Sequence, residues 1–155
     1  MKKVLFILSI MLITTVSAFS QYHTAIGLRG GSHFSGITVR HLPGEHLAYE
    51  GILSLRYHGG AMATLLLEHQ SNTTWGVDGL NWYWGYGAHA GTWDNSDSRL
   101  YNGDFALGAD GILGIEYIVP EIPIVVSLDY HPSINILGPG FFHNGTAFSI
   151  RYILK

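Results

Sequence analysis

The sequence predicts an all-β protein: an eight-stranded antiparallel up-and-down transmembrane β-barrel, preceded by a cleaved signal peptide. Three observations predict this fold. Apolar and polar residues alternate with period two along most of the chain. The polar positions of that alternation carry four of the five arginines and no lysine. The chain begins with a short positive stretch followed by an apolar run, which is typical of an exported protein.

Residues 1–20 are predicted to be the signal peptide, and residues 21–155 the barrel domain. Lys2 and Lys3 precede an apolar run over 4–12, and small residues follow it. Cleavage after Ala18 or after Ser20 fits the preference for small residues, and we favour Ser20. The chain has no cysteine, so neither a lipid anchor at the cleavage point nor a disulfide is expected.

The composition is unusual for a soluble domain. Of the 155 residues, 47% are hydrophobic and only 12% are charged. After the predicted signal peptide the only lysine is Lys155. Soluble surfaces normally mix lysine, arginine and carboxylates, so a water-exposed polar face is not expected. The chain has no basic patch, which argues against a nucleic-acid partner.

Each predicted strand shows the alternation, as in residues 49–58, where Leu53 and Leu55 alternate with Ser54 and Arg56. Turn-forming residues separate the strands, and connections this short predict antiparallel neighbours. The eight predicted strands span residues 22–30, 35–42, 46–58, 61–69, 79–91, 105–118, 123–131 and 145–154.

The two faces differ in composition, which decides which of them points inward. The apolar face is nearly unbroken and has aromatic residues near the strand ends, as expected for a lipid-facing wall with aromatic girdles. The polar face favours arginine, which pairs with carboxylates when enclosed. We therefore predict a structural polar network in the lumen, formed by Arg29, Arg40, Glu50, Arg56, Glu68, Asp110, Glu116, Asp129 and Arg151.

Several segments give the chain a resemblance to a known group of proteins. These are residues 25–31, 36–45, 82–91, 108–132 and 148–155. Together they resemble the small eight-stranded outer-membrane β-barrel proteins of Bacteroidetes-type bacteria, with an OmpA/OmpX-like architecture. Many such proteins end in an aromatic residue, whereas this chain ends in Lys155.

The resemblance implies that both termini lie in the periplasm, with turns there at 43–45, 70–78 and 119–123. It implies outer loops at 31–35, 59–60, 92–104 and 132–144. It further implies outer-membrane lipids and the outer-membrane insertion machinery as partners. Trp93, Tyr101, Phe141 and Phe142 make loops 92–104 and 132–144 candidates for binding an extracellular ligand.

One motif points towards catalysis. His33-Phe34-Ser35 resembles the His-x-Ser motif of lipid A 3-O-deacylases, in which case Glu45 or Glu50 would have to supply the acid. The motif falls in the first predicted outer loop rather than on a late strand, and the spacing to the acid differs. We expect no catalytic residue.

A second group to consider is the nine histidines, of which His33, His58, His131 and His143 are predicted near the outer mouth. Imidazole is a common metal ligand, but no spacing here marks a defined site. We expect solvated rim histidines, no metal and no cofactor.

Residues 85–90, GYGAHA, match the dinucleotide fingerprint, with Asp110 at about the right distance for the ribose. A dinucleotide loop needs a helix after its glycines, and a turn sequence follows here instead. We interpret the stretch as a barrel strand with Gly85 and Gly87 inside and Trp84 outside.

The sequence therefore predicts a monomeric, non-catalytic protein of the Gram-negative outer membrane, exported by the general secretory route. Its lumen is filled by polar side chains, and its role is structural or in surface interaction. Three alternatives stay open: a lipid A-modifying outer-membrane enzyme, a narrow ion channel, and a soluble periplasmic ligand-binding β-barrel.

Overall fold

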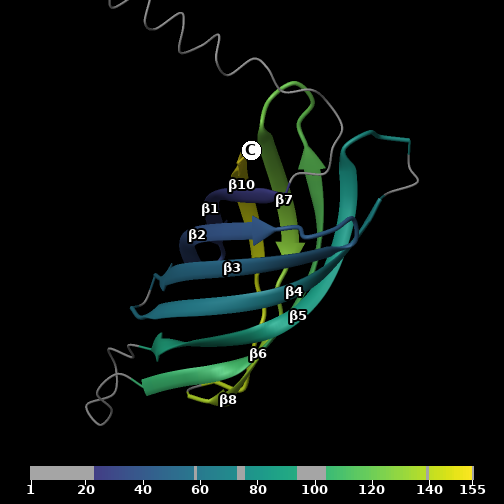
Figure 1. Ribbon diagram of the computed structural model, residues 1–155. Coiled ribbons are helices and arrows are strands. Elements are labelled where there is room, and N and C mark those ends of the chain that lie inside the picture. Colours follow the sequence, from purple (N-terminus) through teal and green to yellow (C-terminus); the bar gives the residue numbers. More distant parts are fainter. Residues whose placement is uncertain (1–22, 58, 73–75, 94–103, 139, 155) are drawn as a thin grey trace, which may run out of the picture.

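The computed structural model describes residues 23–57, 59–72, 76–93, 104–138 and 140–154, which form a β-barrel (Figure 1). The predicted signal peptide lies outside these residues. The strands are β1 (Thr24–Gly31), β2 (Phe34–His41), β3 (Leu47–Arg56), β4 (Ala61–Asn72), β5 (Leu80–Trp93), β6 (Asp104–Ile118), β7 (Ile124–Tyr130), β8 (Ser133–Leu137), β9 (Phe142–His143) and β10 (Thr146–Leu154).

The strands close into a ring. From β1 to β7 each strand pairs antiparallel with the next, and β10 pairs with both β7 and β1. Because β7 and β8 run on as one wall strand against β6, and β9 leads into β10, the ring has eight strands. The predicted fold class is confirmed. Within the described residues, no helix has the length and apolar character needed to span a membrane.

The prediction of an outer loop over residues 132–144 is wrong in part, because β8 and β9 lie within this range. Pro132 has no N–H and so interrupts the ladder between β7 and β8. Its carbonyl nevertheless accepts a bond of 2.8 Å from Gly111 N, and β8 then continues along β6. The proline that signals a strand end in the sequence is thus an interruption within a longer strand.

The other strand boundaries agree with the predicted ones to within three residues. The predicted turn 70–78 begins later than expected, because β4 extends to Asn72. The first and last described strand residues, Thr24 and Leu154, and the turns after β2, β4 and β6 lie at one end of the barrel, which is called the end near the termini below. The opposite end carries the turns after β1 and β3 and the return segment 131–145, and is called the mouth below.

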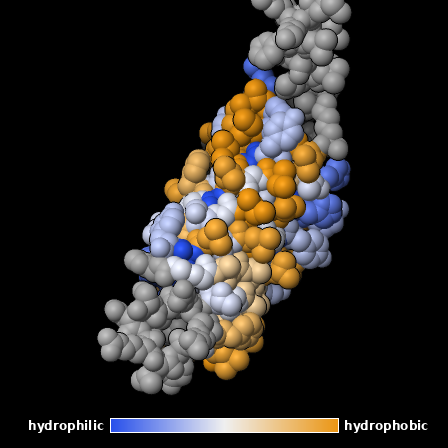
Figure 2. Space-filling model, turned by 90° about the vertical axis from the view of Figure 1, so that its left-hand side faces the viewer, coloured by the Kyte–Doolittle hydropathy of each residue, from blue (hydrophilic) through white to orange (hydrophobic). Residues whose placement is uncertain are grey.

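The polarity of the barrel is reversed relative to a water-soluble protein. Outward-pointing Leu65 is 72% exposed and Leu28 64%, whereas inward-pointing Arg40 is 0% exposed. Apolar residues cover much of the described surface in Figure 2.

Strand β5 contains the residues that match a dinucleotide fingerprint. Residues 85–90 are continuous strand, paired on both sides with β4 and β6, so their backbone does not form a phosphate loop. A Cβ on Gly85 would lie 2.4 Å from the Leu67 carbonyl oxygen, and one on Gly87 1.9 Å from that of Leu65. Glycine here lets β5 bend around the barrel against β4.

Candidate functional site

The lumen is filled in layers by inward-pointing side chains. Near the termini, a small apolar cluster joins strands from across the barrel: Ala25, Leu42, Ala48 and Val125. A second apolar cluster lies nearer the mouth, formed by Ile52, Leu66, Tyr83 and Ile112. Charged side chains lie around and between these clusters. Eight strands leave an interior just wide enough for such packing.

The first ion pair joins β1 to β7. Arg29 donates two hydrogen bonds to the Asp129 carboxylate, from Nη1 at 2.8 Å and from Nη2 at 2.5 Å. Ser149 Oγ accepts a further bond from Arg29 Nη1 at 3.1 Å, and the Tyr83 hydroxyl donates to Asp129 at 3.0 Å. A bidentate guanidinium–carboxylate pair fixes both side chains in one orientation.

The second pair joins β10 to β3. Arg151 Nη2 donates to Glu50 Oε1 at 2.6 Å, and Arg151 Nη1 donates to Ser127 Oγ at 2.8 Å. The Thr38 hydroxyl also donates to Glu50 Oε1. Arg29 Nη1 lies 3.9 Å from the same oxygen, which links the two pairs.

The third group centres on Arg40. Its Nη1 binds Glu116, whose other oxygen accepts a bond of 2.6 Å from Gln70 Nε2. Its Nη2 lies 2.8 Å from Glu68 Oε2, which adds a second ion pair. The guanidinium also lies 4.3 Å from the Tyr83 ring centroid.

These three groups form one arginine network of three guanidinium groups and four carboxylates, all with fully buried side chains. Burying such charges is tolerable only when each is paired, and deleting one partner is costly. These ion pairs connect strands that are far apart in the sequence. Its members are Arg29, Arg40, Glu50, Glu68, Glu116, Asp129 and Arg151.

A different arrangement, the histidine cluster, lies towards the mouth. Asp110 accepts bonds from His89 Nδ1 at 2.8 Å and from His131 Nε2 at 3.0 Å. His89 Nε2 lies 2.8 Å from Asn135 Oδ1, and Asn135 Nδ2 lies 3.4 Å from His143 Nε2. We define the cluster as His89, Asp110, His131, Asn135 and His143.

The structure thus places eight of the nine predicted network residues within the buried lumen. Asp110, however, pairs with imidazoles rather than with an arginine. Arg56 is half-buried at the mouth, where it lines a cavity of about 240 Å³. His131, expected to be a solvated rim residue, is tied to Asp110 instead.

Sequence reasoning overlooked three participants. Thr38 and Gln70 fall in phase with Arg40 and Glu68 on their strands, so the alternation could have identified them. Asn135 lies on β8, inside what the sequence presented as a loop, and no pattern pointed to it.

The structure does not assemble the lipid A deacylase arrangement. Ser35 is exposed on the outer wall, whereas Glu50 is buried in the lumen against Arg151. Five residue pairs of the β2–β3 ladder separate Ser35 from the level of Glu50, about 17 Å at the usual strand rise. Glu45 lies at the opposite end of the barrel.

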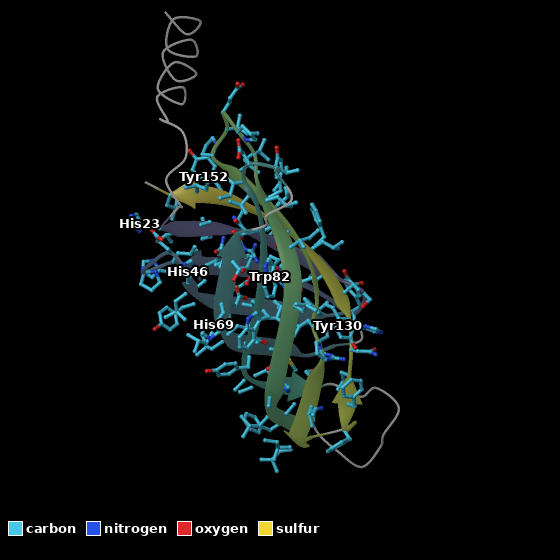
Figure 3. All side chains as sticks on the ribbon, turned by 90° about the vertical axis from the view of Figure 1, so that its right-hand side faces the viewer. His23, His46, His69, Trp82, Tyr130 and Tyr152 are labelled. Carbon is cyan, nitrogen blue, oxygen red and sulfur yellow. The ribbon has the colours of Figure 1, made fainter. Side chains whose placement is uncertain are left out.

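The histidines do not form a metal centre in the part of the chain that the structure describes, where no group of three His, Cys, Asp or Glu side chains has suitable placement. His23, His46 and His69 lie along the end near the termini, while Tyr130 lies towards the mouth (Figure 3). His69 stacks on Trp84 with ring centroids 4.7 Å apart. Predicted rim residue His58 lies outside the described residues, as does Tyr101.

Comparison with known proteins identifies the architecture. No protein-family profile matches the chain, and no curated protein sequence matches it. Its structure is similar to that of the N-terminal β-barrel domain of Pseudomonas aeruginosa OprF, with a TM-score of 0.68. The match covers 85% of this chain and 100% of that domain, at 16% sequence identity. The fold is that of a small eight-stranded barrel. At this identity the likeness extends to the fold alone.

Proposed function

We propose that this chain is a small, monomeric outer-membrane β-barrel protein of a Gram-negative bacterium. The protein is structural or acts in surface interaction, and has no catalytic role. The Bacteroidetes-type lineage, export by the secretory route, and contact with outer-membrane lipids and the insertion machinery belong to the same proposal.

The observation that carries the proposal is the reversed polarity of the wall. Outward-facing Leu28, Leu53 and Leu65 are each more than half exposed, while the charged side chains of the arginine network are buried. An apolar surface this continuous is unstable in water but is solvated by lipid. Outward-facing aromatic residues lie near both ends of the wall: Tyr49, Trp82, Trp84 and Tyr152 near the termini, and Tyr57, Phe105, Tyr130 and Phe148 near the mouth.

The same polarity argues against a soluble ligand carrier, whose cavity would be lined by apolar groups. A large hollow lies instead on the outer wall, with a volume of about 1050 Å³ and a lining that includes Leu55, Ala63 and Phe148. Acyl chains of the bilayer would fill it.

Heat-modifiable migration tests the proposal. The protein refolded in detergent should migrate differently on a gel before and after boiling. A protein that stays soluble without detergent and shows no shift contradicts membrane insertion. A planar bilayer should show no large conductance steps, whereas unitary steps that change in Arg56→Ala would favour a narrow channel.

A substitution on the wall tests the lipid-facing surface directly. Leu65→Lys should destabilise the inserted barrel by about 2–4 kcal/mol, because it places a charge in hydrocarbon. Urea unfolding in lipid vesicles measures the loss. Glu121→Lys, in an exposed turn, is the matched control and should change little. Equal stability of the two variants would contradict a lipid-facing Leu65.

A further inference from the structure

We propose that the lumen binds one proton, shared between Glu50 on β3 and Glu68 on β4, so that the arginine network of the folded barrel is neutral. This site goes beyond the proposed function, which assigns no bound species to the lumen. Three features support it: the placement of the two carboxyl groups, the oxygens that lack a donor, and the charge count of the network.

Glu50 and Glu68 lie side by side on the inner face of the β3–β4 ladder. Glu50 pairs with Leu66 and Glu68 pairs with Ala48, so the two glutamates are diagonal neighbours. Diagonal neighbours lie about 7–8 Å apart, within reach of long side chains. The two carboxyl groups come within hydrogen-bonding reach of each other, and both side chains are 0% exposed. Two ionised carboxylates this close repel each other, whereas a shared proton turns the contact into a hydrogen bond.

One oxygen of each carboxyl group lacks a donor. Glu50 Oε1 accepts hydrogen bonds from Arg151 and Thr38. Glu68 Oε2 lies 2.8 Å from Arg40 Nη2. The other two oxygens, Glu50 Oε2 and Glu68 Oε1, have no hydrogen-bond partner among the described residues. Buried acceptors without a donor are costly. A proton on Glu68 Oε1 supplies the missing donor, and Glu50 Oε2 accepts its hydrogen bond.

The charge count of the network favours the same proton. Three guanidinium groups face four carboxylates there, all with fully buried side chains. If all four carboxylates were ionised, one excess negative charge would remain in the enclosed lumen. A buried charge without compensation is so costly that the group becomes neutral instead. With one proton on Glu68, the three arginines face three ionised carboxylates, Glu50, Glu116 and Asp129.

The surroundings of the pair suit a proton better than a metal cation. On β3, Ala48 lies towards the termini and Ile52 towards the mouth, while Leu66 lies towards the mouth on β4. The charged or titratable groups around the pair are Arg29, Arg40, Tyr83, Glu116, Asp129 and Arg151. A metal cation needs several oxygen ligands in one place. In the part of the chain that the structure describes, no group of three acidic or histidine side chains is placed to hold one. A proton needs only the two carboxyl groups.

Infrared spectroscopy of the protein refolded in detergent at neutral pH tests the site. The parent should show the C=O band of a protonated carboxyl group, recognised by its shift in D2O, and Glu68→Gln should lose this band. Glu121→Gln, in an exposed turn, is the matched control and should keep it. Because glutamine resembles a protonated glutamate in shape and charge, Glu68→Gln should unfold at the same urea concentration as the parent. Glu116→Gln should unfold at a lower one, because its NH2 group would face a donor of Arg40 or Gln70.

Three results would overturn the shared proton. The first is a parent spectrum without the band. If the urea midpoint of that parent rises with sodium chloride but not with tetramethylammonium chloride at equal ionic strength, the site holds a metal cation instead. The second is a band that persists in Glu68→Gln, which would place the proton on another group. The third is a Glu68→Gln protein that is clearly less stable than the parent or lacks heat-modifiable migration, which would show that the fold needs Glu68 in its ionised form.

Discussion

The arginine network and the histidine cluster lie in the same lumen but meet different conditions. The network is fully enclosed, and its cations are guanidinium groups, which stay charged at all accessible pH values. The cluster adjoins an open cavity, and the partners of its carboxylate are imidazoles instead of guanidinium groups. The guanidinium groups lie where the side chains are fully enclosed, and the imidazoles lie beside the cavity at the mouth. The difference indicates that the inner part of the lumen is packed for stability, whereas the part near the mouth is more open.

The largest expected effect breaks the network itself. Arg151→Ala removes the donors to Glu50 and Ser127 and leaves Glu50 buried with fewer partners. We expect a loss of about 3–5 kcal/mol in unfolding free energy, measured by urea titration in lipid vesicles. Arg56→Ala at the half-buried mouth should cost less than about 1 kcal/mol.

A double substitution refines this prediction. Arg151→Met combined with Glu50→Leu should recover much of the stability lost in Arg151→Ala, because apolar residues of similar size often replace a buried ion pair without loss. If Arg151→Ala and Arg56→Ala cost the same, the contrast between the two regions fails.

A smaller effect is expected where a glycine makes room for the network. A Cβ at Gly114 would lie 2.7 Å from Tyr83 Cζ and 2.6 Å from Asp129 Cβ. Gly114→Ala should therefore displace Tyr83 and cost about 1–3 kcal/mol by overpacking. Thermal unfolding followed by gel migration measures the loss. Gly30→Ala, with no atom within 4 Å of its added Cβ, is the control and should be near neutral.

Among the losses predicted for buried residues, the smallest is at the histidine cluster. Asp110→Asn keeps the shape of the side chain but replaces one acceptor oxygen with an NH2 group. This group faces an imidazole N–H, so one of the two hydrogen bonds to His89 and His131 is lost. We expect a cost of about 1–2 kcal/mol, and imidazole resonances that shift for both His89 and His131. A cost as large as that of Arg151→Ala would show that the mouth is as structural as the network.

The alternation predicted which side chains enter the lumen. In a strand, successive side chains point to opposite faces, whichever residues they then contact. Arg40 and Glu50 could be placed in this way from the sequence. The alternation could not predict which charged side chains form ion pairs with one another. Arg29 and Asp129 lie 100 residues apart, and their meeting depends on closure and stagger of the ring. Asp110 paired with histidines because β8 continues past Pro132, where the local signal indicated a loop.

The seam between β1 and β10 pairs residues from the two ends of the described chain, Thr24 with Leu154 and Gly31 with Ala147. Contacts so distant in sequence form slowly, since the intervening chain must first be ordered. The ion pairs Arg29–Asp129 and Arg151–Glu50 span 100 and 101 residues, so they require the ring to be almost complete. Until the seam closes, the charged groups lack their partners and a partly inserted sheet stays unfavourable in lipid. We therefore expect assembly without stable half-inserted intermediates, with ring closure as the late step.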